Sequence, residues 1–183
     1  MLSPILIDAG PLIALFDSSE KHHRPVKAFL KENPYRYVST IAVFTEVSHM
    51  LDFSAGAQRD FYEWVMYKGV IISDINQHDM PRLVSLTQKY ADIPMDFADA
   101  SLVITAEKTG IREIISLDKD FDIYRLPGKE LIRNVYSSAS SSSTSRPKAA
   151  QAASTGAGED MSTPAALRDS MGKREPPDLR KPK

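Results

Sequence analysis

The segment Pro94–Phe121 reads PMDFADASLVITAEKTGIREIISLDKDF and joins a helix pattern to a strand pattern. Asp96 and Asp99 stand at the start of the expected helix. Residues 98–106 are apolar almost all round a helix, so we expect this helix to be buried on more than one side. Gly110 then ends the helix, because glycine readily adopts the left-handed backbone of a helix terminus.

A short apolar run at residues 113–117 follows and is typical of a strand covered on both faces. Asp118 and Asp120 come directly after its carboxyl end. Together with Asp96 and Asp99 they place four carboxylates in one helix–strand unit. Such a set repels itself unless a positive charge lies among its members, and a divalent cation is the simplest partner.

The chain on either side of this unit, up to residue 136, alternates short apolar runs with amphipathic stretches. We expect strands at 4–7, 37–39, 70–72 and 131–135, a turn and helix at 9–17, and helices at 20–31, 40–53, 58–67 and 78–90. This alternation predicts an α/β fold, a three-layer α/β/α sandwich with a mostly parallel central sheet. Side chains expected in the core are Trp64, Leu83, Leu86 and one face of the helix at 40–53, made of Ile41, Phe44, Val47 and Leu51.

The composition changes at Ser137, and residues 137–183 are rich in Ser, Ala and Pro without apolar periodicity. A segment of this kind cannot bury enough surface to offset the entropy lost on ordering. We therefore expect a folded domain at 1–136 and a disordered tail at 137–183. The tail carries 8 basic and 5 acidic side chains, so the alternative to a solvated tail is a weak contact with RNA or a partner.

The overall composition excludes several classes of protein. The chain has no cysteine, so it holds neither disulfides nor a thiolate metal site. No apolar run reaches membrane-spanning length, and the first residues, MLSPILIDAG, lack the pattern of a signal peptide. The simplest interpretation is a cytoplasmic protein without membrane contact. The net charge of −1 gives no argument for tight nucleic-acid binding by the domain, and only Arg112, Lys119 and Arg125 are scattered candidates for RNA contacts.

Asp8 lies at the carboxyl end of the first expected strand, as Asp118 does after the strand at 113–117. The carboxyl ends of parallel strands face one crevice, so both side chains should point into it. A buried acid costs several kcal/mol unless it is paired. Taken singly, however, either aspartate also fits an ordinary turn or helix cap.

Asp96 and Asp99 share a helix face, because they are three residues apart. Asp96 is readily explained as the helix cap or as a partner of the helix dipole. Asp99 is harder to explain, since like charges at this spacing cost a few tenths of a kcal/mol and the buried helix body follows at once. A pair of like charges at this spacing, with nothing in the sequence to compensate the repulsion, indicates a functional site. Glu46, by contrast, lies mid-helix and reads by itself as a solvated side chain.

These acids stand in four stretches that resemble the acidic motifs of PIN-domain ribonucleases, in the family's order. The stretches are ILIDAGPLIALFD with Asp8, STIAVFTEVSHML with Glu46, MDFADASLVITAE with Asp99 and IISLDKDF with Asp118. The resemblance covers residues 3–135 and is greatest to the VapC-type toxins of type II toxin–antitoxin pairs. The tail is not part of the family's pattern.

The resemblance implies a metal-dependent endoribonuclease that hydrolyses RNA phosphodiester bonds. Asp8, Asp99 and Asp118 would hold Mg²⁺ or Mn²⁺, and Glu46 would complete the shell or orient the attacking water. Oxygen ligands without histidine or cysteine also favour these ions over zinc. Within each acidic pair the assignment is open, so Asp96 and Asp120 are further candidate ligands. The family also implies a homodimer and an antitoxin that blocks the site.

Two other classes compete with this interpretation. A phosphoacceptor signalling domain also gathers aspartates and Mg²⁺ at strand ends, but it needs a paired acid cluster on its first strand, where Asp8 stands alone. A non-catalytic PIN-like module that binds RNA or acts as a scaffold predicts the loss of one of the four acids, and all four are present. Replacement of Asp99 separates enzyme from scaffold.

Overall fold

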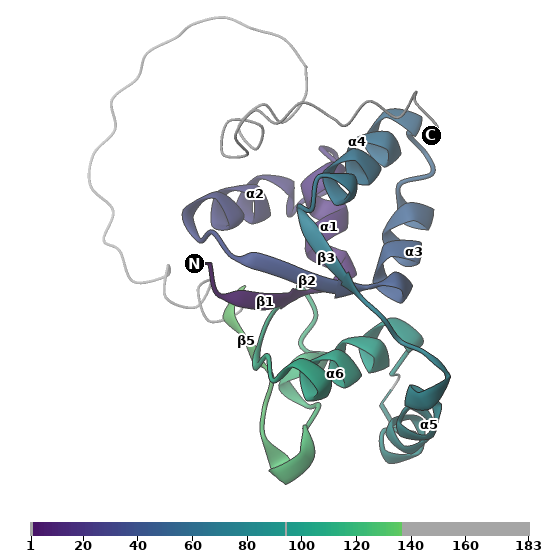
Figure 1. The fold of residues 1–183 in the computed structure, drawn as a ribbon. Coiled ribbons are helices and arrows are strands. Elements are labelled where there is room, and N and C mark those ends of the chain that lie inside the picture. The colour runs from purple at the N-terminus through teal and green to yellow at the C-terminus, as the bar shows by residue number, and fades with distance from the viewer. Residues whose placement is uncertain (1, 94, 137–183) are drawn as a thin grey trace, which may run out of the picture. The chain divides into compact units, whose positions relative to one another are not determined.

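The computed structural model describes residues 2–93 and 95–136 (Figure 1). The tail at 137–183, for which we predict disorder, lies outside the described residues, and so do Met1 and Pro94. The domain boundary at residue 136 therefore stays a prediction. Within the described part of the chain, no helix is long and apolar enough to cross a membrane.

Five parallel strands form the sheet of the described domain. In chain order they are β1 (Pro4–Ile7), β2 (Arg36–Thr40), β3 (Val70–Ser73), β4 (Glu113–Ile115) and β5 (Arg133–Asn134). Their order across the sheet is β3-β2-β1-β4-β5 (Figure 1). The central strand β1 pairs on both sides, with Leu6 opposite Val38 of β2 and Ile114 of β4. Its side chains Ile5, Leu6 and Ile7 are fully buried, as expected for a strand covered on both faces.

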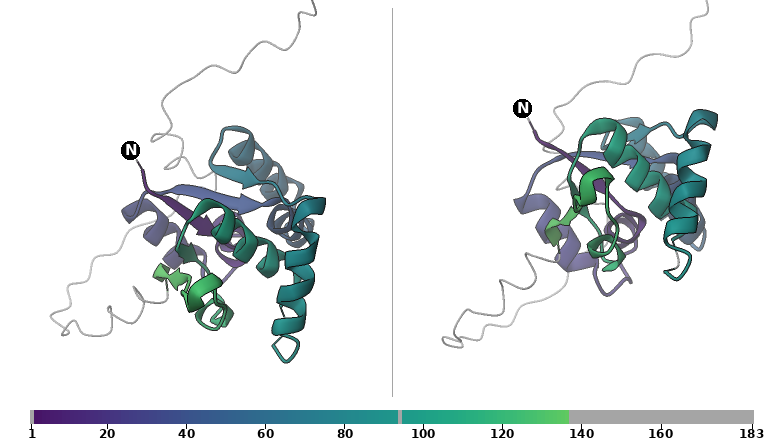
Figure 2. Two further views of the ribbon diagram at one scale, coloured as in Figure 1. Left: turned by 60° about the horizontal axis from the view of Figure 1, so that its bottom comes forward. Right: turned by 90° about the horizontal axis from the view of Figure 1, so that it is seen from below.

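Helices cover both faces of this sheet. They are α1 (Ala9–Phe16), α2 (His23–Glu32), α3 (Ile41–Met50), α4 (Ala55–Met66), α5 (Met80–Lys89) and α6 (Phe97–Thr109). Figures 1 and 2 show α1, α2 and α4 on one side of the sheet and α5 and α6 on the other. Helix α3 begins directly after β2, at the carboxyl-terminal edge of the sheet, and contacts both α1 and α6. The predicted α/β/α sandwich with a parallel sheet is confirmed.

Helix α6 has the ends and the burial that its sequence predicts. Oδ1 of Asp96 accepts a hydrogen bond of 2.8 Å from the backbone N–H of Asp99, so Asp96 is the N-cap. Gly110 ends the helix in the left-handed conformation, with φ at 76°. Every side chain from Ala100 to Ala106 is buried. The helix is therefore packed on nearly all sides, and its acidic first turn is fixed in place.

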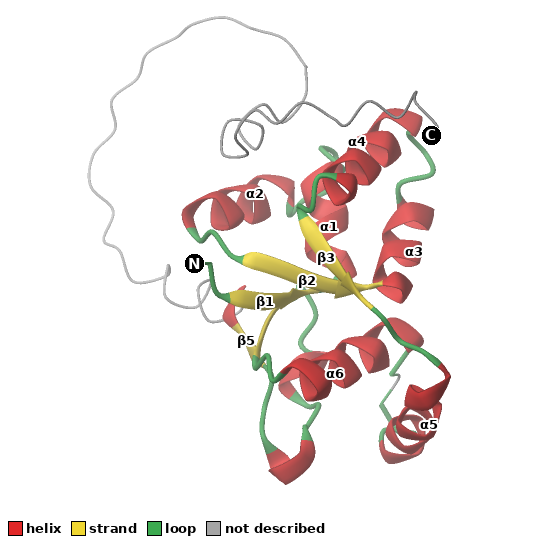
Figure 3. Ribbon diagram, viewed as in Figure 1, coloured by secondary structure: helices red, strands yellow, loops and turns green. Residues whose placement is uncertain are grey.

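Two boundaries were predicted wrongly because capping side chains decide them. The helix expected at 58–67 begins at Ala55, since the hydroxyl of Ser54 accepts a hydrogen bond from the backbone of Ala57. The helix expected at 78–90 is divided into a 3₁₀ turn, Gln77–Asp79, and α5 (Figure 3). Asn76 caps the turn.

The strand and the helix face that lie nearest the acids also differ from prediction. The strand expected at 113–117 ends at Ile115, because Ser116 turns toward hydrogen bonds with Asp8 and Asp118.

Ile41, expected inside, is 50% exposed, whereas Val43 is fully buried. The start of α3 is fixed by Thr40, whose hydroxyl lies 2.7 Å from that of Ser101 on α6. Helix α3 turns Val43 and Val47 inward and Ile41 outward. Trp64 is buried, as predicted, and Leu86 likewise, but Leu83 is only half-buried.

Candidate active site

Asp8 and Ser116 are joined where the neighbouring strands β1 and β4 end. The backbone N–H of Asp8 donates to the carbonyl oxygen of Ile115 over 3.1 Å, which continues the pairing of the strands by one residue. Oδ2 of Asp8 accepts a hydrogen bond of 2.7 Å from the Ser116 hydroxyl, and Oδ1 accepts one of 2.7 Å from the backbone of Ala9. The Asp8 side chain is buried, which raises its pKa despite these two bonds. The charges of Asp96 and Asp118 raise the pKa further.

Asp99 reaches the same region from the first turn of α6. Its Oδ2 accepts a hydrogen bond of 3.0 Å from the hydroxyl of Tyr124. Burial raises the pKa of Asp99 to about 7, and the charges of Asp96 and Asp8 add to the rise. The Tyr124 bond lowers the pKa of Asp99, but by less than burial raises it. A carboxyl group whose pKa is raised this far lacks a neighbouring positive charge that would stabilise its ionised form.

Asp96 is exposed, and one of its oxygens caps α6, as described above. Its charge nevertheless raises the pKa of Asp8, of Asp99 and of Glu46. Asp96 is therefore both a structural cap and a close electrostatic neighbour of the other acids. The cap is therefore confirmed, and the role of Asp96 as a metal ligand stays a prediction.

Glu46 projects from the exposed side of α3, as its position off the apolar face predicts. Partial burial raises its pKa, and the charges of Asp8 and Asp96 raise it further. The charges of Asp8 and Asp96 therefore act on Glu46. A fully solvated surface glutamate would not have its pKa raised in this way. The position of α3 at the carboxyl-terminal edge of the sheet brings Glu46 to this cluster.

Asp118 and Asp120 differ in their surroundings. The backbone N–H of Asp118 donates to the Ser116 hydroxyl over 2.9 Å, and Oδ1 of Asp118 accepts from the backbone of Asp120 over 3.1 Å. The charge of Asp118 raises the pKa of both Asp8 and Asp99. Asp120 acts on neither of them, and its own pKa is raised by burial and by Asp118. The cluster thus contains Asp118, with Asp120 at its margin.

Three polar residues near the acids were not singled out from the sequence: Ser116, Tyr124 and Asn134. Asn134 of β5 donates to the carbonyl oxygens of Ser116 (2.9 Å) and Asp118 (3.3 Å), which holds the turn after β4. Ser116 stands two residues before Asp118, so the strand-end pattern was its only sequence signal. Tyr124 and Asn134 carry no local signal, because their partners lie on other elements.

The side chains of the acidic cluster have the chemistry that a hard divalent cation prefers, but their positions do not form a site for one. All of these side chains are carboxylates. Burial first, and mutual repulsion second, raises the pKa of Asp8, Glu46 and Asp99, and a cation would relieve that repulsion. In residues 2–93 and 95–136, however, no three His, Cys, Asp or Glu side chains stand close enough together to hold a metal ion. Side-chain rotation would be needed to bring the oxygens onto one ion.

The comparisons with known proteins agree with this arrangement. The family model described as PIN domain matches residues 5–126, which is more than half of the chain. The chain belongs to the PIN-domain family. All four acids of the resemblance, Asp8, Glu46, Asp99 and Asp118, lie inside the matched range, and the family match argues against a phosphoacceptor domain.

The fold of this PIN domain is similar to that of a solved toxin. VapC20 of Mycobacterium tuberculosis, a sarcin-ricin loop cleaving toxin, matches with a TM-score of 0.59 and 17% sequence identity. The match covers 65% of this chain and 93% of that of VapC20. No curated protein matches the chain significantly. At this identity the similarity shows the fold of the PIN domain and nothing finer.

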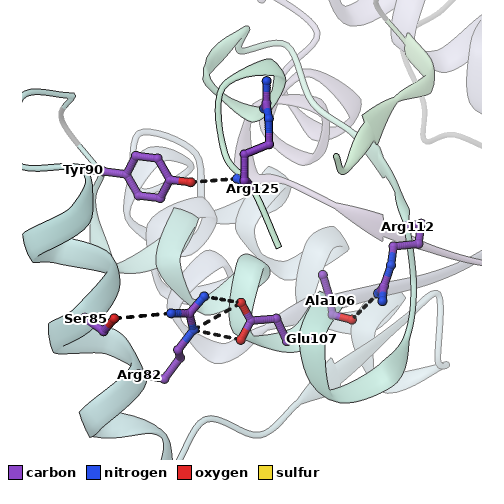
Figure 4. Close-up of polar contacts among 7 residues, drawn as sticks. All are labelled: Arg82, Ser85, Tyr90, Ala106, Glu107, Arg112 and Arg125. Atoms are coloured by element: carbon purple, nitrogen blue, oxygen red, sulfur yellow. Dashed lines mark hydrogen bonds and ion pairs between the residues drawn. The ribbon is translucent and has the colours of Figure 1, made fainter. Parts of the chain in front are cut away.

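Two of the three cationic side chains expected as RNA contacts of the PIN domain, Arg112 and Arg125, are engaged within the protein. Arg112 donates to Glu130 over 2.7 Å and to the carbonyl oxygen of Ala106 over 3.0 Å. Arg125 donates from its guanidinium to the carbonyl oxygen of Asp122 over 2.8 Å. Figure 4 shows the Arg112 contact with Ala106. These two arginines, expected as RNA contacts, would have to give up internal bonds to reach a phosphate.

Proposed function

We propose that this PIN domain is a metal-dependent endoribonuclease and the toxin of a type II toxin–antitoxin pair. The observation that carries the proposal is the convergence of acids from separate elements: Asp8 after β1, Glu46 on α3, Asp99 on α6 and Asp118 after β4. Family membership supports a nuclease, and the fold of the VapC20 toxin supports the toxin role.

The proposed ligands are Asp8, Asp99 and Asp118, with Mg²⁺ or Mn²⁺ as the ion. Such an ion supplies a more acidic water and neutralises charge on the scissile phosphate. The protein's part is to hold carboxylate oxygens at fixed positions around it. Ser116 orients the Asp8 carboxylate, and Asp8 can act only as an anion, so the raised pKa of Asp8 works against ion binding at low pH.

Glu46 has a different proposed role from the three aspartates. It is exposed and lies on α3, whereas Asp8 and Asp118 follow strands and Asp99 lies on α6. We assign it the orientation of the attacking water or completion of the metal shell. Asp96 remains a further candidate ligand through the oxygen that does not cap α6, and Asp120 is the weaker candidate because its charge does not contribute to the raised pKa of Asp8 or of Asp99.

The proposal includes partners and a compartment. We infer an RNA substrate, a cytoplasmic location, a homodimer and an antitoxin that covers the site. Single-stranded RNA segments suit such a site, since their bases and backbone are accessible. The competing proposal is a non-catalytic RNA-binding or scaffold module, and it is favoured by the lack of three carboxylates already placed for a metal among the described residues.

The test is incubation of the purified protein with a mixed RNA pool in Mn²⁺, in Mg²⁺ and in EDTA. Asp8→Asn and Asp99→Asn are the site variants, and Asp60→Asn on α4 is the matched control. We expect cleavage that requires the metal, persists in Asp60→Asn and disappears in both site variants. Metal-independent cleavage, or unchanged cleavage in Asp99→Asn, would overturn the assignment. Without cleavage of any RNA, absent Mn²⁺ binding by calorimetry would favour the scaffold.

A further inference from the structure

Tyr124 lies beside the acidic cluster without being part of it. Its ring is fully buried, and its hydroxyl donates to Oδ2 of Asp99 over 3.0 Å. We propose that Tyr124 is a positioning residue, which holds the Asp99 carboxylate in one orientation so that its other oxygen is presented to the metal ion. This inference rests on the proposed function, because it assumes that Asp99 is a metal ligand.

The Tyr124 ring itself is held from two sides by aromatic neighbours. Phe121 lies edge-on to it, with ring centroids 5.4 Å apart and an interplanar angle of 84°. Tyr90 lies 5.2 Å away at 64°. Edge-to-face contacts of this kind fix ring orientation as well as burying area. The direction of the Tyr124 hydroxyl is therefore set by packing and not by its bond to Asp99 alone.

The backbone next to Tyr124 is held as well. The backbone N–H of Arg125 donates to the hydroxyl of Tyr90 over 2.7 Å, as Figure 4 shows. Tyr90 is the residue that ends α5. Ring and backbone of the segment that carries Tyr124 are thus both attached to the end of this helix.

Helix α5 is in turn tied to the helix that carries Asp99. Arg82 of α5 binds Glu107 of α6 with two parallel bonds, Nη2 to Oε1 at 2.6 Å and Nε to Oε2 at 3.0 Å (Figure 4). Such bidentate pairs are geometrically specific. The connections therefore form a closed ring, from Asp99 along α6 to Glu107, across Arg82 to α5, and back through Tyr90 and Tyr124 to Asp99.

The closed ring of contacts that holds the Asp99 carboxylate has a consequence for metal binding. Hydrogen bonds to the ligands of a metal fix their orientation, and their loss typically weakens metal binding about 10- to 100-fold. A tyrosine hydroxyl suits this task, since it donates one bond without adding a positive charge that would compete with the ion. The competing explanation is a buried hydroxyl that has simply found a partner. That role would affect folding stability but not metal affinity.

The experiment is a calorimetric titration of the full chain with Mn²⁺, for wild type, Tyr124→Phe and Tyr37→Phe. Tyr37→Phe also removes a half-buried hydroxyl, from β2 on the far side of β1 from β4. We expect the Kd for Mn²⁺ to rise about 10-fold in Tyr124→Phe and to stay within about twofold of wild type in Tyr37→Phe. RNA cleavage by Tyr124→Phe should fall at limiting Mn²⁺ and return at saturating Mn²⁺, which a purely structural defect would not do.

The outcomes separate this inference from the proposed function. If wild type binds Mn²⁺, Asp99→Asn does not, and Tyr124→Phe binds as wild type does, the positioning role is wrong and the metal site stands. If wild type does not bind Mn²⁺, both are wrong. If Tyr124→Phe does not fold, Tyr90→Leu replaces it, because that variant keeps the Tyr124 hydroxyl but removes both the ring contact and the Arg125 bond that orient it. Unchanged Mn²⁺ affinity in Tyr90→Leu would then overturn the inference, and a several-fold loss would support it.

Discussion

The hydroxyl of Ser116 donates a hydrogen bond of 2.7 Å to Oδ2 of Asp8, which lies 108 residues earlier in the chain. The same hydroxyl accepts from the backbone N–H of Asp118 over 2.9 Å. One side chain therefore orients one acid of the cluster and fixes the backbone of another. The bond to Asp8 depends on β1 and β4 being neighbours in the sheet, whereas the bond with Asp118 is local to the turn after β4.

Replacement of Ser116 by alanine should destabilise the protein by about 1–3 kcal/mol, because a buried carboxylate oxygen and a backbone N–H both lose their partner. Urea unfolding in EDTA measures this free energy. The matched control is Ser39→Ala, whose equally buried hydroxyl donates to the neutral carbonyl of Ile7, with an expected loss of about 1 kcal/mol. Equal losses in the two variants would contradict a special role for the Asp8 bond.

The metal-free protein should become less stable as the pH rises from 5 to 8. Burial and the charges of Asp96 and Asp8 raise the pKa of Asp99 to about 7, whereas the unfolded chain releases this proton near pH 3.9. Between these two values the native state binds more protons than the unfolded state, so stability falls with increasing pH. We expect about 1 kcal/mol from Asp99, after allowance for its partial solvent screening.

Thermal unfolding in EDTA at several pH values checks this dependence. Asp99→Asn should show a flatter profile than wild type. Parallel profiles would mean that Asp99 ionises normally in the native state. Addition of Mg²⁺ or Mn²⁺ at pH 8 should raise the unfolding temperature of wild type, since an ion that binds only the native state stabilises it.

Glu46→Gln should reduce RNA cleavage by about 10²-fold or more without loss of stability. The side chain is exposed, so its neutralisation leaves no buried polar group unpaired. It also removes the repulsion by Asp8 and Asp96 that raises the pKa of Glu46. Cleavage rates and urea unfolding are measured together, with Glu32→Gln at the exposed end of α2 as control. Retained cleavage in Glu46→Gln would remove this residue from the site.

Gly69→Ala should unfold or strongly destabilise the domain, because a Cβ at this position would lie 2.2 Å from the ring of Trp64. Trp64 is buried and tilted against Phe16 and Tyr37, so its ring has little freedom to retreat. Circular dichroism and urea unfolding test the variant. Gly56→Ala in the first turn of α4, where the added Cβ meets nothing closer than 3.8 Å, should be neutral or up to about 1 kcal/mol stabilising.

Much of the fold could be predicted because its signals are local. The apolar run of β1, the N-cap Asp96 and the terminal Gly110 each act within a few residues, and all three were found where the sequence placed them. Strand β4 begins at the predicted residue but ends two residues early. The errors arose where a distant partner intervened. Ile41 is exposed and Val43 is buried because α3 packs against α1 and α6, and no pattern within residues 40–53 contains the position of those helices.

The candidate site divides in the same way. The sequence by itself determined the acids, their order and the strand ends that carry them, since residue type and hydrophobic period are local properties. Only the tertiary structure decided that Asp118 rather than Asp120 acts on Asp8 and Asp99, and that Ser116 and Tyr124 bind their carboxylates. The physical reason is that these bonds and repulsions act over a few ångströms, between residues that only the parallel pairing of β1 with β4 and the packing of α6 bring together.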